Sequence, residues 1–166
     1  MVTPKIRDAT PEDIPTILHF IQQLAIYEKA LDQVEATEEL LKETLFTNPY
    51  ARCIIAEIED GTQGLKPVGF SLYFFAYSTW TARPTLFLED LFVLPEHRNA
   101  GIGKHLFKRL GEIAKENKCP RVDWHVLDWN APSIAFYEKS LGAKMHSEWR
   151  LMRLERDGIE RLANFI

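Results

Sequence analysis

The sequence predicts an α/β protein of one domain, with a largely antiparallel sheet flanked by helices. Three segments rich in aromatic and β-branched residues follow one another with short connections, at residues 53–58, 67–77 and 85–94. Such a succession is typical of an antiparallel meander. On both sides of it, apolar residues recur every three to four positions, as expected for amphipathic helices. The length of 166 residues fits a single domain over residues 1–166.

Before the meander we expect one strand and two helices. The strand covers residues 2–7 and is followed by Thr10, which is suited to cap a helix whose first position is a proline. Apolar residues at helical spacing extend this helix to about Lys29. After a loop, a short helix is expected over residues 38–46, with Thr37 as its cap.

After the meander, the order of elements alternates between helices and strands. Helical spacing begins at Ile102 and continues to about residue 114. A strand over residues 122–127, a helix over residues 131–141 and a last strand over residues 143–154 complete the predicted order. We find no repeat, low-complexity tract or linker between domains in the sequence.

The charge and hydropathy of the chain exclude some classes of partner. The net charge is −4, from 20 basic and 24 acidic residues. This acidic balance argues against a nucleic-acid partner, which needs a basic face to bind phosphates. The sequence shows no signal peptide and no apolar run near the roughly 20 residues that span a bilayer. We therefore expect a cytoplasmic protein with no membrane partner.

The cysteines and histidines do not form a metal-binding pattern. Cys53 and Cys119 lie singly in apolar surroundings, which favours buried, unreactive thiols over a disulfide or a zinc site. The histidines also lack the spacing of metal ligands. No metal is expected.

A glycine-rich loop carries the first functional signal. Residues 98–104, RNAGIGK, lie between a predicted strand and a predicted helix. Glycines let backbone N–H groups converge on an anion, and a helix N-terminus adds about half a positive charge, which suits a phosphate or pyrophosphate. A Walker loop needs glycine where Arg98 stands, and a dinucleotide fingerprint needs glycine where Leu106 stands. A glycine-rich helix start without a ligand is the remaining alternative.

The loop acquires a specific meaning together with residues 129–143, WNAPSIAFYEKSLGA. In this order, the two segments resemble the GNAT N-acetyltransferase family. The resemblance implies that the loop holds the pyrophosphate of acetyl-CoA, that the preceding strand presents the thioester, and that the later segment contacts the pantetheine arm and sulfur. Asn99 stands where the family usually has glycine. Because asparagine tolerates a left-handed backbone, we expect the loop to keep its shape.

Further segments are similar to the diamine acetyltransferases, a subfamily that includes spermidine/spermine and thialysine acetyltransferases. They are Tyr27-Glu28, Leu88-Glu89-Asp90 and residues 127–130, LDWN. Residues 77–80, YSTW, resemble the thialysine type, whereas the polyamine type carries an acid where Ser78 stands. One carboxylate fewer favours an amine shorter than a polyamine.

Two residues are the catalytic candidates by this resemblance. An alkylammonium with a pKa of about 10.4 must lose a proton before it attacks, and Glu89 is the candidate to receive it, through water. Tyr137 is the candidate to hydrogen-bond or protonate the coenzyme sulfur. A salt-bridged Glu89 and a core Tyr137 are the structural alternatives. Because neighbouring strand residues point to opposite faces, Glu89 and Asp90 share a face only if the strand bulges.

The remaining site residues follow from the same resemblance. The coenzyme acetyl-CoA is expected to contact the backbone of Leu91, Phe92 and Val93, the loop residues Arg98, Asn99, Ala100, Gly101, Ile102, Gly103 and Lys104, and also Asn130, Ser133 and Tyr137. The amine is expected to contact Tyr27, Glu28, Glu89, Asp123, Trp124, His125 and Glu148. Asn130 and Ser133 suit the cap of the following helix equally well.

The predicted function is acetyl transfer from acetyl-CoA to a primary amine of a small molecule, by direct attack in a ternary complex. Thialysine, lysine-like amino acids and short diamines are favoured over polyamines. The resemblance also implies a homodimer whose amine sites lie near the subunit interface. Two alternatives remain: a protein or peptide N-acetyltransferase, and a non-catalytic acyl-CoA-binding sensor. The sequence has no Gly-x-Ser-x-Gly motif, which would have argued for a covalent acyl-enzyme.

Overall fold

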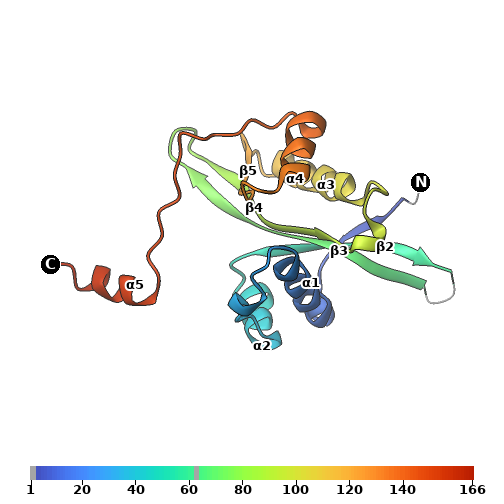
Figure 1. Cartoon of the computed structure of the whole chain (residues 1–166), viewed down its shortest axis with the longest axis horizontal. Helices are drawn as coiled ribbons and strands as arrows, with labels where there is room; N and C mark the ends of the chain where they lie inside the picture. Colours follow the sequence, from blue (N-terminus) through green and yellow to red (C-terminus); the bar gives the residue numbers. More distant parts are fainter. Residues whose placement is uncertain (1–2, 62–63) are drawn as a thin grey trace. The chain divides into compact units, whose positions relative to one another are not determined.

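The structure, a computed structural model, describes residues 3–61 and 64–166. Contacts divide the chain into two compact units, Met1–His125 and Val126–Ile166 (Figure 1). The first unit contains the whole sheet, with the strand order β1-β2-β3-β4-β5. The second unit is made of helical turns and irregular segments.

The sheet has the predicted, largely antiparallel character. Each of the strands β1, β2 and β3 pairs in antiparallel fashion with the strand that follows it in the chain. Only β5 is parallel to its neighbour, β4. The predicted meander is therefore confirmed, and with it the α/β class. The bounds are β1 (Lys5–Asp8), β2 (Arg52–Asp60), β3 (Gly64–Ser78), β4 (Arg83–Val93) and β5 (Val122–Trp124). The predicted bounds differ from these by up to three residues: β5 ends three residues early, and the first strand begins at Lys5, whereas Val2 lies outside the described residues.

The helices of the first unit begin at the predicted caps. Thr10 forms a capping box with Asp13 around the 3-10 turn that precedes α1, and the Thr37 hydroxyl accepts a hydrogen bond from the Leu40 N–H at 3.2 Å. The helical elements are η1 (Pro11–Asp13), α1 (Ile14–Tyr27), η2 (Leu31–Gln33), α2 (Glu38–Lys42), η3 (Glu43–Thr47), η4 (Pro95–His97) and α3 (Ile102–Glu116). Among the described residues, no helix has both the length and the apolar character needed to cross a membrane.

Helices cover both faces of the sheet. One face packs against α3, through buried side chains such as Leu106 and Leu110, which meet Leu86 and Leu88 of β4. The other face packs against α1 and α2, and it includes Phe92 of β4. Figure 1 shows α1 and α2 on one side of the sheet and α3 on the other. The two faces are called the α3 face and the α1 face below.

A buried ion group holds the start of α1 on the sheet. Arg7 of β1 reaches both Asp13, at 2.6 Å, and Glu57 of β2, at 2.8 Å. Both carboxylates are buried, and the hydrogen bond from Arg7 lowers the pKa of Asp13. Because α1 starts from this anchor, its far end, where Tyr27 and Glu28 lie, is set relative to the sheet.

In the second unit, the predicted helix is confirmed. It consists of α4 (Ala131–Phe136) continued by the π turn η5 (Tyr137–Leu141), and it ends at Gly142 with a left-handed φ of 70°. Glycine suits this end because it adopts positive φ without a steric penalty. The structure also has a helix that the sequence pattern did not predict, α5 (Arg156–Ala163).

The strand predicted at residues 143–154 is wrong. These residues are described, and they form no strand. Apolar residues here do suit a strand, but a strand also needs a neighbour for its backbone hydrogen bonds, and none pairs with this segment in the described chain. Trp149 and Met152 are instead 73% and 88% exposed.

We predict that a methyl group at Gly69 destabilises the sheet. A Cβ at this position would lie 2.7 Å from the carbonyl oxygen of Phe92, where β3 and β4 approach closely. Gly69→Ala should therefore lower the free energy of unfolding by about 1–3 kcal/mol, measured by denaturant unfolding. Gly111→Ala is the matched control, since Gly111 is exposed in α3 with no atom near its Cβ. It should stabilise by about 0.5–1 kcal/mol. Equal midpoints for the two variants would contradict this account of the close approach.

Candidate active site

A β-bulge in β4 lies at the centre of the candidate site. Consecutive residues of β3, Leu72 and Tyr73, pair with Asp90 and Leu88 of β4. Glu89 is therefore an extra residue in β4, without an opposite partner in β3. A bulge of this kind interrupts the alternation of side chains along a strand.

The bulge brings two carboxylates to the same face of the sheet. Leu88 and Leu91 both belong to the core on the α3 face. Counting forward from Leu88, alternation places Glu89 on the α1 face, and counting back from Leu91 it also places Asp90 there. Glu89 and Asp90 are expected from the sequence to share a face only if the strand bulges, and the strand does bulge here.

A third carboxylate completes an acid cluster, defined here as Glu28, Glu89 and Asp90. Glu28 lies at the C-terminal end of α1, and partial burial raises its pKa. Burial, together with the negative charges of Glu89 and Glu28, raises the pKa of Asp90 to about 6. Sequence reasoning proposed Glu28 and Glu89 as site residues but not Asp90, because regular alternation would have turned Asp90 away.

After the bulge, one edge of β4 is left without a strand partner in the described chain. Pairing of β4 with β5 stops at Leu88 and Trp124. On its other side, β4 stays paired with β3, and the Leu94 N–H donates to the Val68 carbonyl. Backbone groups alternate in direction along an antiparallel pair, so Phe92 points to β3, whereas Leu91 and Val93 point to the open edge. Of the three backbone positions predicted to contact pantetheine, two therefore face an open edge.

The predicted glycine loop connects this edge to α3. Asn99 has a φ of 63° and Gly101 has a φ of 87°, both left-handed. The expectation that Asn99 tolerates this conformation is confirmed. Ala100 packs on the core of the α3 face, which anchors the middle of the loop, and α3 begins at Ile102. The first N–H groups of a helix have no acceptor within the helix, so this end can bind an anion such as a pyrophosphate.

Arg98, at the start of the loop, links three parts of the site. Its Nε donates to the Val93 carbonyl at 3.0 Å. Its guanidinium lies over the Tyr27 ring, 5.1 Å from the centroid, and over the Phe92 ring, at 5.4 Å. A predicted coenzyme-binding residue thus contacts a predicted amine-binding residue directly.

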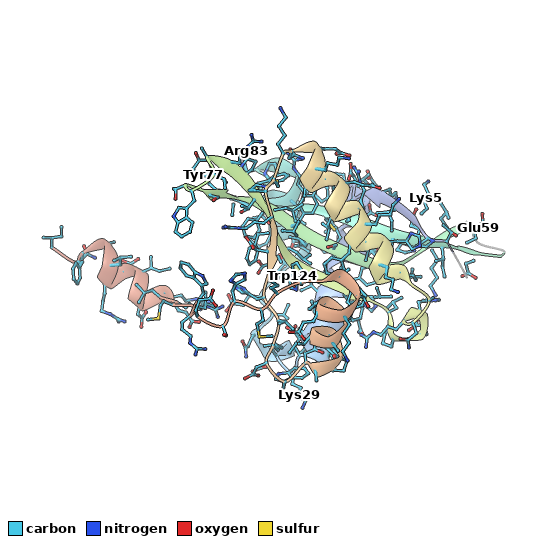
Figure 2. The ribbon with its side chains drawn as sticks, turned by 90° about the horizontal axis from the view of Figure 1, so that it is seen from above. Lys5, Lys29, Glu59, Tyr77, Arg83 and Trp124 are labelled. Atoms are coloured by element: carbon cyan, nitrogen blue, oxygen red, sulfur yellow. The ribbon has the colours of Figure 1, made fainter. Side chains whose placement is uncertain are left out.

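The three site residues predicted around β5 do not act as one group. Trp124, labelled in Figure 2, packs against the core of the α3 face. Asp123 and His125 flank it in the chain, and alternation turns them to the α1 face. Asp123 pairs with Arg121 at 2.7 Å, and His125 packs edge-on against Phe87 at 5.1 Å. Trp124 is thus separated from the face that carries the acid cluster.

In the second unit, Asn130 and Ser133 form the cap of α4. The Asn130 side-chain oxygen accepts from the Ser133 N–H at 3.4 Å, so the capping role expected for them is confirmed. Tyr137 is the first residue of the π turn, is half-buried, and lies with its ring 5.7 Å from that of Phe136.

Glu148 is exposed in the second unit and interacts with a histidine. Its carboxylate lies 2.9 Å from Nδ1 of His146, and this hydrogen bond lowers the pKa of Glu148. The pair is close in sequence and is open to solvent.

In the described part of the chain, no group of three or more His, Cys, Asp or Glu side chains is arranged so that it could hold a metal ion. Cys53 is buried, as predicted, and burial raises the pKa of its thiol well above the ordinary range. Cys119 is only half-buried, so the expectation of a buried thiol is wrong at this position, and both thiols are free.

Known proteins are similar to this chain over most of its length. The model of the acetyltransferase (GNAT) family matches residues 19–143. Thialysine N-epsilon-acetyltransferase of Sus scrofa is 41% identical, covering 98% of this chain and 99% of the relative. Spermidine/spermine N(1)-acetyltransferase-like protein 1 of Homo sapiens is 37% identical over 92% of this chain, which corresponds to 23% of that protein. A solved integron cassette protein from V. cholerae is 27% identical with a TM-score of 0.76, covering 98% of this chain and 99% of that one.

We predict that Asp90 makes the stability of the protein fall between about pH 4 and pH 6. Its pKa of about 6 in the folded chain lies above its ordinary value of 3.8, so the folded state binds more protons in this window. Stability is then lost as the pH rises through the window, by about 3 kcal/mol. Asp90→Asn should remove this loss and raise the free energy of unfolding at pH 7, measured by urea unfolding at a series of pH values. The same pH dependence in both proteins would contradict the burial of an ionised Asp90.

Proposed function

This chain belongs to the acetyltransferase (GNAT) family, and we propose that it acetylates a primary amine of a small molecule by direct attack in a ternary complex. One observation carries the proposal: the bulge of β4 sets the acid cluster beside the open backbone edge that leads into the glycine loop. The cluster suits a cationic amine, whereas the edge and the loop suit an anionic coenzyme with an amide-bearing arm. Both features belong to the first unit.

The residues of this chain fit acetyl-CoA, the co-substrate of the family. We propose that the backbone of Leu91 and Val93 pairs with the pantetheine amides, as an added strand would. The backbone of residues 98–104 holds the pyrophosphate, assisted by the charges of Arg98 and Lys104. Acetyl-CoA supplies the activated thioester carbonyl. Asn130, Ser133 and Tyr137 are further proposed contacts of the coenzyme.

The acid cluster is proposed to bind the amine as an ammonium ion and then to prepare it for attack. Glu89 takes a proton from the attacking ammonium group through water, and Glu28 and Asp90 hold the remaining positive charge of the substrate in place. The neutral nitrogen attacks the thioester carbon, so that a C–N bond forms and the C–S bond breaks. Below about pH 6, protonation of Asp90 reduces the charge of the cluster, so amine binding weakens.

Tyr137 is proposed to stabilise the departing sulfur by hydrogen bonding. Full proton transfer from a tyrosine of pKa about 10 to a thiolate of pKa about 8.5 is uphill by about 2 kcal/mol. After the C–N bond forms, the nitrogen must lose one more proton to become an amide. The sulfur therefore finally takes this proton from the nitrogen.

Thialysine, a lysine-like amino acid or a short diamine is the proposed substrate. The relative of Sus scrofa that is 41% identical is named for thialysine. The buried Ser78 at the end of β3 adds no charge to the site, which suits an amine with fewer cationic groups than a polyamine. Tyr27, Asp123, His125 and Glu148 are further proposed contacts. We also propose that both units act as one acetyltransferase domain, in a cytoplasmic homodimer with its amine sites near the interface.

The proposed function predicts that the protein turns over acetyl-CoA with thialysine or a short diamine. Turnover is measured through the free thiol of the coenzyme A that is released. A panel of thialysine, lysine, ornithine, short diamines, spermidine and a lysine-containing peptide separates the alternatives. Turnover of the peptide alone would support a protein acetyltransferase instead. Tight coenzyme binding without turnover of any amine would support a sensor.

In the same assay, Glu89→Gln should lower kcat by about 10²- to 10⁴-fold, because the amide cannot accept the proton. Glu59→Gln is the matched control, since Glu59 is an exposed residue of β2 and should keep full activity. If the two variants are equally active, Glu89 is not the proton acceptor.

A further inference from the structure

Arg98 contacts residues that belong to two different proposed sites. Its Nε is bonded to the carbonyl of Val93, at the end of the strand edge proposed for pantetheine. Its guanidinium covers the ring of Tyr27, which the amine is proposed to contact, with 5.1 Å between the carbon of the guanidinium and the ring centroid. The side chain therefore extends from the coenzyme loop to the wall of the amine site.

The position of this side chain is determined by more than one contact. Phe92 lies beneath the guanidinium at 5.4 Å and is itself buried against Phe20 and Phe70 in the core of the α1 face. A guanidinium is a rigid plane, so a bond at Nε and a stack on a buried ring together define its orientation. Tyr27, which is 37% exposed, rests on this plane.

We propose that Arg98 is a positioning residue that couples the two sites, so that binding of the coenzyme increases the affinity for the amine. This inference rests on the proposed function. The pyrophosphate binds Arg98, and the stack transmits the restraint to Tyr27. The reciprocal effect must be equal: the amine increases the affinity for coenzyme A by the same factor.

Two effects give the coupling a positive sign. A pyrophosphate that bonds the guanidinium restrains it, and the Tyr27 ring stacked on it loses mobility before the amine arrives, so the amine has less ordering to do. The pyrophosphate also neutralises a positive charge next to Tyr27 and Glu28, where a cationic amine is proposed to bind. A stack of a guanidinium on a partly exposed ring is expected to change affinity about two- to fivefold.

The coupling is measured with coenzyme A and thialysine, which bind together but do not react because no acetyl group is present. Titration calorimetry gives the Kd of coenzyme A without thialysine and with saturating thialysine, and the ratio of the two is the coupling factor. For the wild type we expect a factor of about two to five. The KM of the amine and kcat are measured separately with acetyl-CoA.

The variants separate the ring from its hydroxyl and the stack from general coenzyme affinity. Tyr27→Leu removes the ring and should reduce the factor to about one, with a higher KM for the amine and little change in the Kd of coenzyme A alone. Tyr27→Phe keeps the ring and should keep the factor. Lys104→Met is the matched loop control: it should weaken coenzyme A binding and leave the factor unchanged, because it keeps the contact of Arg98 with the Tyr27 ring.

Each outcome decides the inference. A factor above one that is lost in Tyr27→Leu and in Arg98→Met, but kept in Tyr27→Phe and Lys104→Met, supports it. A factor of one in a wild-type protein that turns over thialysine overturns the inference alone. A factor unchanged by Tyr27→Leu, or lost equally in Tyr27→Phe, also overturns it. A wild type that neither binds coenzyme A nor acetylates any amine overturns the proposed function and the inference with it.

Discussion

The bulge at Glu89 is the constraint on which the candidate site depends. From Leu86 to Leu88, β4 is paired on both sides, and after the bulge it is paired only with β3 in the described chain. The single extra residue also brings Glu89 and Asp90 to one face. The two carboxylates and the open backbone edge therefore lie at the same point of β4, directly after Leu88. The glycine loop follows directly because β4 leads into it.

Charge is distributed in the site by two different means. An anionic coenzyme can bind a chain with a net charge of −4 because backbone N–H groups and the start of α3 attract it, and formal charge counts omit both. The carboxylates of the acid cluster suit a cationic amine, the class of substrate proposed above. Burial, and then the negative charges of Glu89 and Glu28, raise the pKa of Asp90, so the charge of the cluster depends on pH. Arg98 contacts both parts of the site, because it donates to the Val93 carbonyl before the glycine loop and lies over the ring of Tyr27, the neighbour of Glu28 in the chain.

The sequence predicted features that depend on neighbours in the chain and missed those that depend on distant ones. The Thr37 cap and the left-handed Asn99 were predictable because each rests on the local backbone. The bulge was not, since it is defined by the register between β3 and β4, and so Asp90 was left out of the site. Residues 143–154 have strand-forming side chains, but a strand also needs a partner, which propensity does not supply. The stack of Arg98 on Tyr27 joins residues far apart in the chain and leaves no local pattern.

Amide hydrogen exchange measured residue by residue by NMR, with and without coenzyme A, tests the role of the open edge of β4 most directly. The amides of Leu91 and Val93 should exchange more slowly when coenzyme A is bound, because pantetheine takes the place of a neighbouring strand. The amide of Phe92 is the internal control, since its backbone already points to β3 and its exchange should stay unchanged. If coenzyme A binds and the exchange of Leu91 and Val93 does not slow, the open edge of β4 is not the coenzyme site.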